Sequence, residues 1–452
     1  MSNLSWQDRL DRVIPGGAHT YSKGRDVFPG NAPAVLVRGR GCYVWDPEGT
    51  RFLDFGMGLK SVVLGYANRK VDAAARKASR LGNNLSRPSM TELLAAEELV
   101  DLIPSAEMVK FAKNGSNVTT AAVKIARAGT GRKLVAVPVE QPFFSFDDWF
   151  IGTTNSPSGV PEEHVALTKS FKYGDLNSLR NLFCDFPNEI AAVIMEPAVE
   201  LIECPQIHRQ CVTACLSIKM DLTRAYLQEV RDFCSSHGTV LIFDEMRTGF
   251  RWHLSGAQAL FGVTPDLSTF GKAIANGYSV SALVGSRNLM ELGSTNKKGT
   301  RRTFLLSSTH GAEISSLEAF RQTRVEMLQN NVVEELWNYG SKLSEVIVTA
   351  LDETGWSEHI WLTGPPVALN LNFGASELWS DIQLKTRFYA LMAESKILMP
   401  TITQSASHGR REMNSLMNAL TTNLEILRNN KDSAPYFRQD PTLLAPVFRD
   451  FN

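Results

Sequence analysis

The segment STFGKAIANG, Ser268–Gly277, places Lys272 between two glycines directly after an apolar stretch. The run TVLIFDE, 239–245, precedes it and ends in the carboxylates of Asp244 and its neighbour. In open α/β sheets, ligands bind at the carboxyl ends of strands, and glycine lets backbone and ligand approach closely. The ordinary alternative is a surface lysine in a loop, because the chain has 47 Lys and Arg residues. The segment therefore indicates either a solvated lysine or an amine at the ligand-binding edge of a sheet.

Apolar runs alternate with helical patterns around this segment. Such runs, rich in Val, Ile and Leu, indicate a buried, mostly parallel sheet that helices cover on both faces. The expected strands are 108–113, 133–139, 190–198, 239–245 and 281–285, and the expected helices are 90–103 and 116–131. The sequence therefore predicts an α/β domain with a mostly parallel central sheet.

The two ends of the chain carry different patterns. Ser5 is a suitable N-cap for a short helix over 5–14, and alternation around DPEGT predicts a hairpin over 34–55. Beyond residue 320, two helical patterns and then two strand patterns predict a smaller α+β domain. The expected domains are an N-terminal segment that belongs to the small domain, a large domain and a C-terminal small domain with a tail, over residues 1–68, 69–322 and 323–452.

Composition excludes several classes of protein. Among 452 residues, 47 basic and 47 acidic side chains give a formal net charge of zero, which favours neither nucleic acid nor an anionic membrane as a partner. No apolar run approaches the roughly 20 residues of a membrane span, and the first ten residues do not resemble a secretory signal. Six cysteines in so long a chain do not suggest a disulfide framework. We therefore expect a cytoplasmic protein.

One group of cysteine and histidine residues leaves two interpretations open. Cys204, His208, Cys211 and Cys215 lie within twelve residues, and all four are of types that bind zinc. Their spacing, however, matches no familiar zinc finger or ribbon. A loop insertion with ordinary thiols is the favoured interpretation, and no metal site is predicted.

Three features that suit one cofactor lie at expected strand ends or helix starts. Lys272 offers an amine for an imine, and Asp244 offers a carboxylate at a strand end. Gly115 and Ser116 open a helix, where free backbone N–H groups and a partial positive charge suit a phosphate. Pyridoxal 5'-phosphate requires an amine for its aldehyde, a carboxylate for its ring nitrogen and donors for its phosphate. The three features together predict a site for this cofactor.

The motifs then resemble those of a known family. LIFDEMRTGFR followed by TPDLSTFGKAIANGYSVSALVG, over residues 241–285, resembles the signature of class-III aminotransferases, which are pyridoxal-phosphate enzymes of fold type I. VIPGGAHTYSKG, near the N-terminus, resembles an element of glutamate-1-semialdehyde 2,1-aminomutases. The resemblance covers nearly the whole chain. It implies a large domain with a mostly parallel central sheet and a smaller α+β domain.

The resemblance also implies a role for each site residue. Lys272 would form the Schiff base and move protons, and Asp244 would hold the pyridine nitrogen protonated. The cofactor-binding residues would be Gly115 and Ser116 at the phosphate, Phe143 stacked on the ring, Glu196 at a neighbouring strand end, and Thr309, which would reach the phosphate from the partner chain. These roles imply a homodimer with shared active sites that takes a small-molecule amino donor and a keto or aldehyde acceptor.

Departures from the family pattern concern the substrate more than the cofactor. Arg247 stands where many relatives have Gln, Leu59 and Lys60 replace the mutase pattern, and Lys23 falls near a substrate-binding Arg of the mutase. A two-substrate aminotransferase and an intramolecular aminomutase that acts on glutamate-1-semialdehyde or a related compound therefore both stay open, with the transferase favoured. A binding or regulatory protein on the same fold, without cofactor, is the third alternative.

Overall fold

The computed structural model describes residues 4–198, 201–202, 215–296, 302–304, 306–429 and 443–445. The chain forms two compact units. One comprises Met1–Asn68, Gln206–Leu216 and Glu334–Arg449, and the other comprises Arg69–Pro205, Ser217–Val333 and Asp450–Asn452. We call the first the small unit and the second the large unit.

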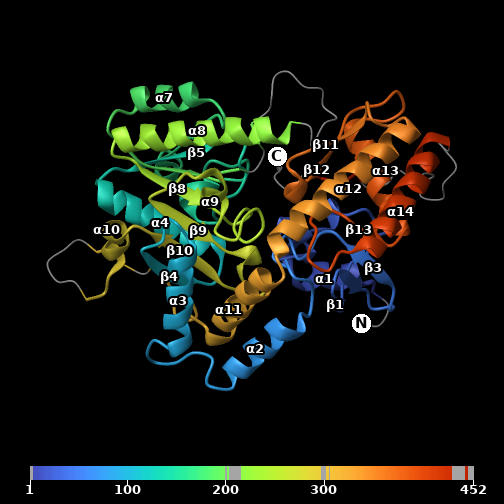
Figure 1. Ribbon diagram of the computed structural model, residues 1–452. Coiled ribbons are helices and arrows are strands. Elements are labelled where there is room, and N and C mark those ends of the chain that lie inside the picture. The colour runs from blue at the N-terminus through green and yellow to red at the C-terminus, as the bar shows by residue number, and fades with distance from the viewer. Residues whose placement is uncertain are drawn as a thin grey trace. The chain divides into compact units, whose positions relative to one another are not determined.

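A seven-stranded sheet is the centre of the large unit (Figure 1). Its strand order is β4-β10-β9-β8-β7-β5-β6. β10 runs antiparallel to both of its neighbours, and the other neighbouring strands are parallel. The strands are β4 (Met108–Ala112), β5 (Leu134–Pro138), β6 (Thr168–Phe171), β7 (Ile190–Met195), β8 (Val240–Asp244), β9 (Leu267–Phe270) and β10 (Ser281–Gly285). The predicted mostly parallel sheet is confirmed.

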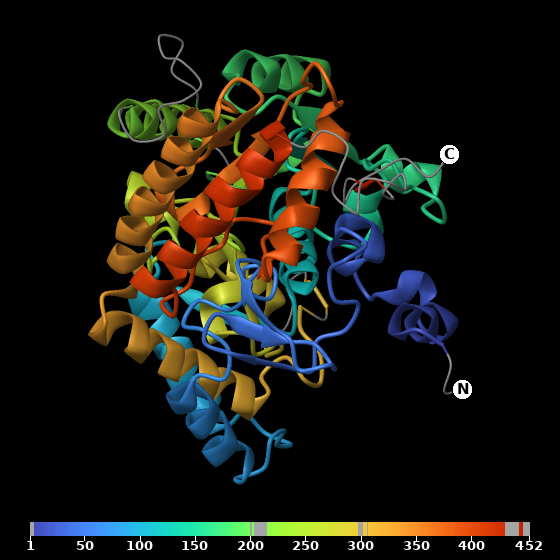
Figure 2. The ribbon, with the colours of Figure 1, turned by 90° about the vertical axis from the view of Figure 1, so that its right-hand side faces the viewer.

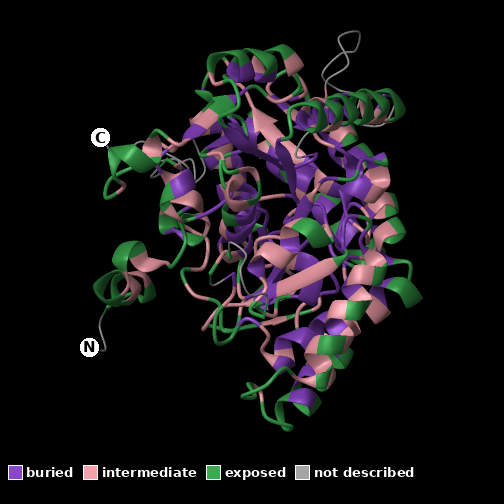
Figure 3. Cartoon of the chain, turned by 90° about the vertical axis from the view of Figure 1, so that its left-hand side faces the viewer, coloured by how far each residue is buried: buried purple, intermediate pink, exposed green. Residues whose placement is uncertain are grey.

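Helices cover this sheet, which explains why its strands are continuously apolar. Every residue of β5, β7, β8, β9 and β10 is buried, and the strands form the buried centre in Figure 3. Helix α4 (Gly115–Thr130) contacts β4, β7, β8, β9 and β10 through a face of small and β-branched side chains. The other main helices of this unit are α2 (Arg69–Ser79), α3 (Met90–Leu102), α7 (Leu176–Asp185), α8 (Leu216–Ser236) and α11 (Ile314–Gln329). Shorter helices are α5 (Asp148–Ile151), α6 (Glu162–Val165), α9 (Ala257–Phe261) and α10 (Arg287–Met290).

The small unit joins segments from the two ends of the chain. Its sheet has the order β1-β2-β3-β13, in which β13 pairs with β3 in parallel, and β11 pairs with β12 in a separate hairpin. The strands are β1 (Arg38–Arg40), β2 (Tyr43–Trp45), β3 (Arg51–Asp54), β11 (Ile360–Thr363), β12 (Asn370–Phe373) and β13 (Ile397–Leu398). The helices are α1 (Trp6–Val13), α12 (Val332–Thr354), α13 (Asp381–Glu394) and α14 (Arg410–Asn429), and the last three appear in orange and red in Figure 2.

Local sequence signals account for the N-terminal elements. The side chain of Ser5 accepts a hydrogen bond from the backbone N–H of Asp8, and the Asp8 carboxylate accepts one from the Ser5 N–H, so a capping box begins α1. The turn DPEGT joins β2 to β3 with antiparallel pairing. Gly49 in that turn has a φ of 85°, a conformation that favours glycine. No helix among the described residues is long and apolar enough to cross a membrane.

Candidate active site

Asp244 and Lys272 follow neighbouring strands at the same edge of the sheet. Asp244 is the last residue of β8, and Lys272 begins a 3-10 turn, η4 (Lys272–Ala275), just after β9. Since β8 and β9 are parallel, their carboxyl ends lie together. Lys272 has a φ of 46°, in the left-handed region that side chains other than glycine seldom adopt. Such conformations cost about 1–3 kcal/mol and cluster at functional sites.

Met246 joins three of the candidate segments. Its backbone N–H donates a 2.9 Å hydrogen bond to Oδ1 of Asp244. A Cβ at Gly115 would lie 3.1 Å from its sulfur, and a Cβ at Gly271 would lie 2.5 Å from it. The start of α4 and the approach to Lys272 therefore pack against one thioether, and the backbone of the same residue binds the end of β8. A side chain at Gly271 would displace that sulfur.

Burial dominates the chemistry of Asp244. The carboxyl is 3% exposed, and burial together with the charge of Glu196 raises its pKa to about 7. Hydrogen bonds from the Met246 N–H and from the Thr269 hydroxyl, at 3.2 Å, both reach Oδ1. No described residue donates to Oδ2, so this oxygen can accept from a ligand. A cationic donor there would stabilise the carboxylate.

Glu196 follows β7 and forms an ion pair with Arg247. The guanidinium donates from Nε to Oε2 and from Nη2 to Oε1, the latter at 2.8 Å. The Gln141 amide binds the Glu196 backbone in both directions, accepting from its N–H at 2.8 Å and donating to its carbonyl at 2.9 Å. Arg247 therefore fixes the carboxylate of Glu196, and Gln141 fixes its backbone.

The Lys272 amine lies near these charges without pairing with either carboxylate. Its side chain is partly buried, and burial lowers its pKa, while Glu196 and Asp244 act in the opposite direction. Among the described residues, none accepts a hydrogen bond from this amine or forms an ion pair with it. A lowered pKa increases the fraction of neutral, nucleophilic amine.

The start of α4 offers donors to an anion. The Asn114 side chain caps the helix by accepting from the Asn117 N–H at 3.1 Å, and the first N–H groups of a helix have no partner within it. The hydroxyl oxygen of Ser116, which is buried, accepts from the Phe146 N–H at 3.1 Å. The Ser116 hydrogen is therefore available to a ligand, together with the N–H groups of Gly115 and Ser116.

Phe143 lies on a loop that is held at both ends by other candidate residues. Gln141 is bound to the backbone of Glu196, and the Phe146 N–H is bound to Ser116. The Thr119 hydroxyl on α4 also donates to the Phe144 carbonyl at 2.8 Å. The Phe143 ring is 43% exposed and packs edge-on against Phe150, with ring centroids 6.2 Å apart. An aromatic face held in this way can stack on a planar ligand.

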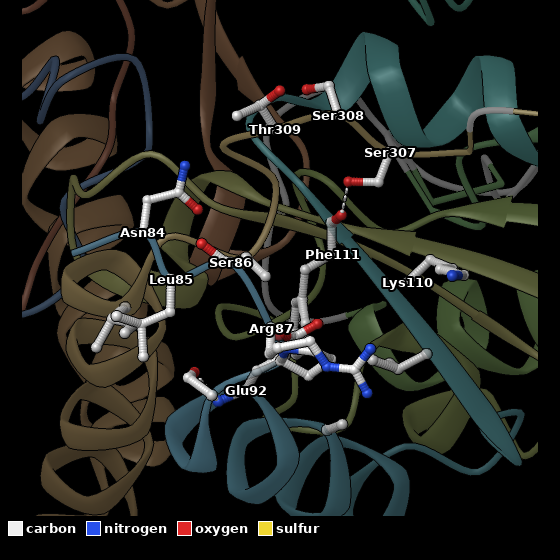
Figure 4. Close-up of a pocket in the computed structure, with 16 residues that line it drawn as sticks. Asn84, Leu85, Ser86, Arg87, Glu92, Lys110, Phe111, Ser307, Ser308 and Thr309 are labelled. Atoms are coloured by element: carbon white, nitrogen blue, oxygen red, sulfur yellow. Dashed lines mark hydrogen bonds between the residues drawn. The ribbon is translucent and has the colours of Figure 1, made fainter. Parts of the chain in front are cut away.

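Thr309 lies elsewhere on the large unit. It lines a cavity of about 380 Å³ whose lining includes none of the other candidate residues (Figure 4). Ser307 donates to the Phe111 carbonyl on β4, as the dashed line in Figure 4 shows. A Cβ at Gly311 would lie 1.9 Å from the Ser307 hydroxyl, so the turn at 307–311 is tight. Thr309 itself is exposed, and no described residue hydrogen-bonds to its side chain.

The cysteine and histidine group is described only at one position. Cys204, His208 and Cys211 lie outside the described residues, and Cys215 is buried. Within the described ranges, no three His, Cys, Asp or Glu side chains are arranged to hold a metal ion. Both interpretations of this group stay open.

The residues at the sheet edge fit pyridoxal phosphate. An amine of lowered pKa, a buried carboxylate with one oxygen open to a donor and an anion seat at a helix start match the aldehyde, the ring nitrogen and the phosphate. The fold and the site together define a pyridoxal-phosphate-dependent enzyme of fold type I.

Comparison with known proteins identifies the family. The family model "Aminotransferase class-III" matches residues 26–201 and 220–358, and the chain belongs to this family. It is 28% identical over 399 residues to 3-aminobutyryl-CoA aminotransferase of Cloacimonas acidaminovorans (strain Evry), covering 88% of this chain and 89% of that protein. It is 34% identical over 300 residues to glutamate-1-semialdehyde 2,1-aminomutase of Syntrophobacter fumaroxidans (strain DSM 10017 / MPOB), covering 64% of this chain and 65% of that protein.

A solved structure agrees in fold. The PLP internal aldimine form of the FumI protein of Sphingopyxis sp. MTA144 superposes with a TM-score of 0.80 at 25% identity, covering 94% of this chain and 96% of that one. The protein is therefore a pyridoxal-phosphate-dependent aminotransferase of class III, and the predicted fold, enzyme class and cofactor are confirmed.

Sequence reasoning missed three contributors to the site. Met246 lies within LIFDEMRTGFR, residues 241–251, but a sequence pattern does not show that its side chain fills the space beside two distant glycines. Gln141 acts through two hydrogen bonds to the Glu196 backbone and the Phe146 N–H through one to Ser116, and such contacts across long sequence separations leave no periodic signal. The sequence marked Arg247 only as a departure from the family pattern, and no sequence signal connected it with Glu196, 51 residues away.

Proposed function

We propose that the protein transfers an amino group between two separate small molecules, an amino donor and a keto or aldehyde acceptor, and that Lys272 is the amine that carries the cofactor. The observation that carries this proposal is the Lys272 amine beside Asp244 at the carboxyl edge of the sheet, where no described residue forms a hydrogen bond or an ion pair with it. Its lowered pKa favours attack on a carbonyl and later return of a proton.

Each of the other site residues has a role in this proposal. When bound, pyridoxal phosphate supplies an electron sink for the carbon that loses its proton. Asp244 would hold a proton at the ring nitrogen through Oδ2, and Gly115 and Ser116 would bind the phosphate through backbone N–H groups and a hydroxyl. Phe143 would orient the ring by stacking on its face, and Glu196 lies at the neighbouring strand end. Lys272 would accept the proton that leaves the substrate carbon and later return it.

We further propose a homodimer in which Thr309 serves the partner's site. The turn at 307–311 is tied to β4 and presents the Thr309 hydroxyl outward, which suits a contact with another chain. Two exposed apolar side chains are associated with this turn: Leu85, which lines the same cavity, is 51% exposed, and Phe304, five residues before Thr309, is 82% exposed. Exposed apolar groups of this kind mark surfaces that a partner covers.

A cytoplasmic location also stays a proposal. Cys42, Cys184 and Cys234 form no disulfide among the described residues, which suits a reducing compartment.

Two half-reactions measured separately test the proposed transfer. The purified protein is incubated with each of a panel of amino donors, separated from small molecules by gel filtration, and then given an unrelated keto acid. The proposal predicts that the second keto acid receives the amino group, as mass spectrometry of an isotopically labelled nitrogen would show. No transfer to the second keto acid, with return of the label only to the carbon skeleton that supplied it when gel filtration is omitted, would instead support the aminomutase.

A further inference from the structure

The position of Glu196 creates a problem for the proposed role of Lys272. Its carboxylate is 4% exposed, and its charge acts on the Lys272 amine more strongly than any other named charge. An opposite charge nearby favours the protonated form of an amine. A protonated amine cannot attack a carbonyl, so an unpaired carboxylate here would hold Lys272 in its inactive form.

Arg247 occupies both oxygens of this carboxylate. The pair is bidentate, with Nε facing Oε2 and Nη2 at 2.8 Å from Oε1, a geometry in which a guanidinium binds a carboxylate most strongly. The partners are mostly withdrawn from solvent, since the side chains of Arg247 and Glu196 are 28% and 5% exposed. Within the described chain, Lys272 forms no ion pair with Glu196. Among the described residues, the carboxylate is therefore paired with the arginine and not with the lysine.

The other charges around Lys272 come from few groups. Asp244 on β8 favours the charged amine, and Arg247 disfavours it. Helix α11 packs against η4, but its charged side chains are engaged with other partners. These pairs are Glu313 with Lys113, Glu326 with Lys70, Glu318 with Arg321, and both Arg321 and Arg324 with Glu98.

We propose that Arg247 is a positioning residue that holds Glu196 in a bidentate pair and so keeps the Lys272 amine neutral. The inference rests on the proposed role of Lys272 as the cofactor-carrying amine. In this arrangement the arginine neutralises a buried carboxylate that would otherwise pair with the lysine.

A double-mutant cycle tests this arrangement, because the two single variants should shift the apparent pKa of the amine in opposite directions. The variants are Arg247→Met, Glu196→Gln and the double variant, all as holoproteins. Two quantities are measured against pH: the absorbance band of the bound cofactor, and the rate at which the protein takes up added pyridoxal phosphate after its own has been removed. Neither readout requires turnover of a substrate.

The predicted shifts have opposite signs. Arg247→Met leaves Glu196 free to pair with Lys272, so the apparent pKa in both readouts rises by about one unit or more, and uptake at neutral pH slows. Glu196→Gln leaves the arginine charge uncompensated, so the apparent pKa falls. In the double variant neither charge remains, and the apparent pKa returns to within about half a unit of the unaltered protein.

Controls separate this inference from the proposed function. Arg224→Met removes an exposed arginine that pairs with Asp221, and it should shift neither readout. In every variant, borohydride reduction and peptide mapping show which lysine holds the cofactor. A label on another lysine would refute the proposed function itself. If the label lies on Lys272 but the apparent pKa does not rise in Arg247→Met, the role of Arg247 is refuted and the proposed function is not. The same holds if the apparent pKa shifts in the same direction in both single variants.

Discussion

Asp244 and Lys272 take their chemical properties from burial and from each other. Burial raises the pKa of the carboxyl to about 7 and lowers that of the amine, so each group is shifted toward its neutral form. Strongly shifted groups that lie together at the edge of a sheet are typical of a reactive site. A cationic ring nitrogen that donates to Oδ2 would lower the pKa of Asp244 again, and the carboxylate would in turn keep that nitrogen protonated.

Asp244→Asn tests this reciprocal effect. The amide keeps the size of the side chain but cannot hold a proton at the ring nitrogen, so the rate of amino transfer should fall by about 100-fold or more while some cofactor stays bound. Steady-state kinetics with cofactor content measured in parallel checks this, with Asp185→Asn, an exposed aspartate on α7, as the matched control. A rate within about twofold of the unaltered protein would contradict the role of Asp244.

At the scale of elements, the sequence predicts those features that rest on local patterns. The N-cap at Ser5, the hairpin around DPEGT, helix α4 and the apolar strands β5, β7, β8 and β10 are all found. Strands β6 and β11 were not predicted, because segments of only four residues carry little periodic signal.

Pairings between distant segments could not be predicted from local patterns. β13 pairs with β3 across more than three hundred residues, and β10 runs antiparallel inside an otherwise parallel sheet. In the site, the reactive side chains of Lys272 and Asp244 could be predicted from sequence motifs. The contacts of Met246 and Gln141 could not, because they depend on the packing of segments that are distant in the sequence. The sequence therefore predicts the reacting groups better than the residues that hold them in place.

At the scale of the whole molecule, the domain boundaries near residues 68 and 322 and the homodimer stay predictions. The exposed Thr309, held on a tight turn beside β4, supports an arrangement in which each site is completed by the partner chain. A closed two-fold dimer would then contain two equivalent sites. Cofactor affinity would depend on assembly, because part of the phosphate network would come from the second chain.

Mixed dimers test this arrangement. Lys272→Ala and Thr309→Ala chains, each of low activity alone, are combined under conditions of subunit exchange. Each mixed dimer should contain one site with both changes and one with neither, so activity should return toward half of that of the unaltered dimer per verified mixed dimer. If mixed dimers form without any return of activity, or if the active species sediments as a monomer, Thr309 does not act in the partner's site.

Chemical trapping of the imine shows whether Lys272 is the residue that carries the cofactor. The purified protein is reduced with borohydride and digested, and its peptides are mapped by mass spectrometry. We expect the pyridoxyl label on Lys272. The Lys272→Ala variant should remain folded but lose both the label and turnover. The control variant Lys124→Ala, which changes an exposed lysine on α4, should keep both. A label on another lysine, or full activity in Lys272→Ala, would contradict this role of Lys272.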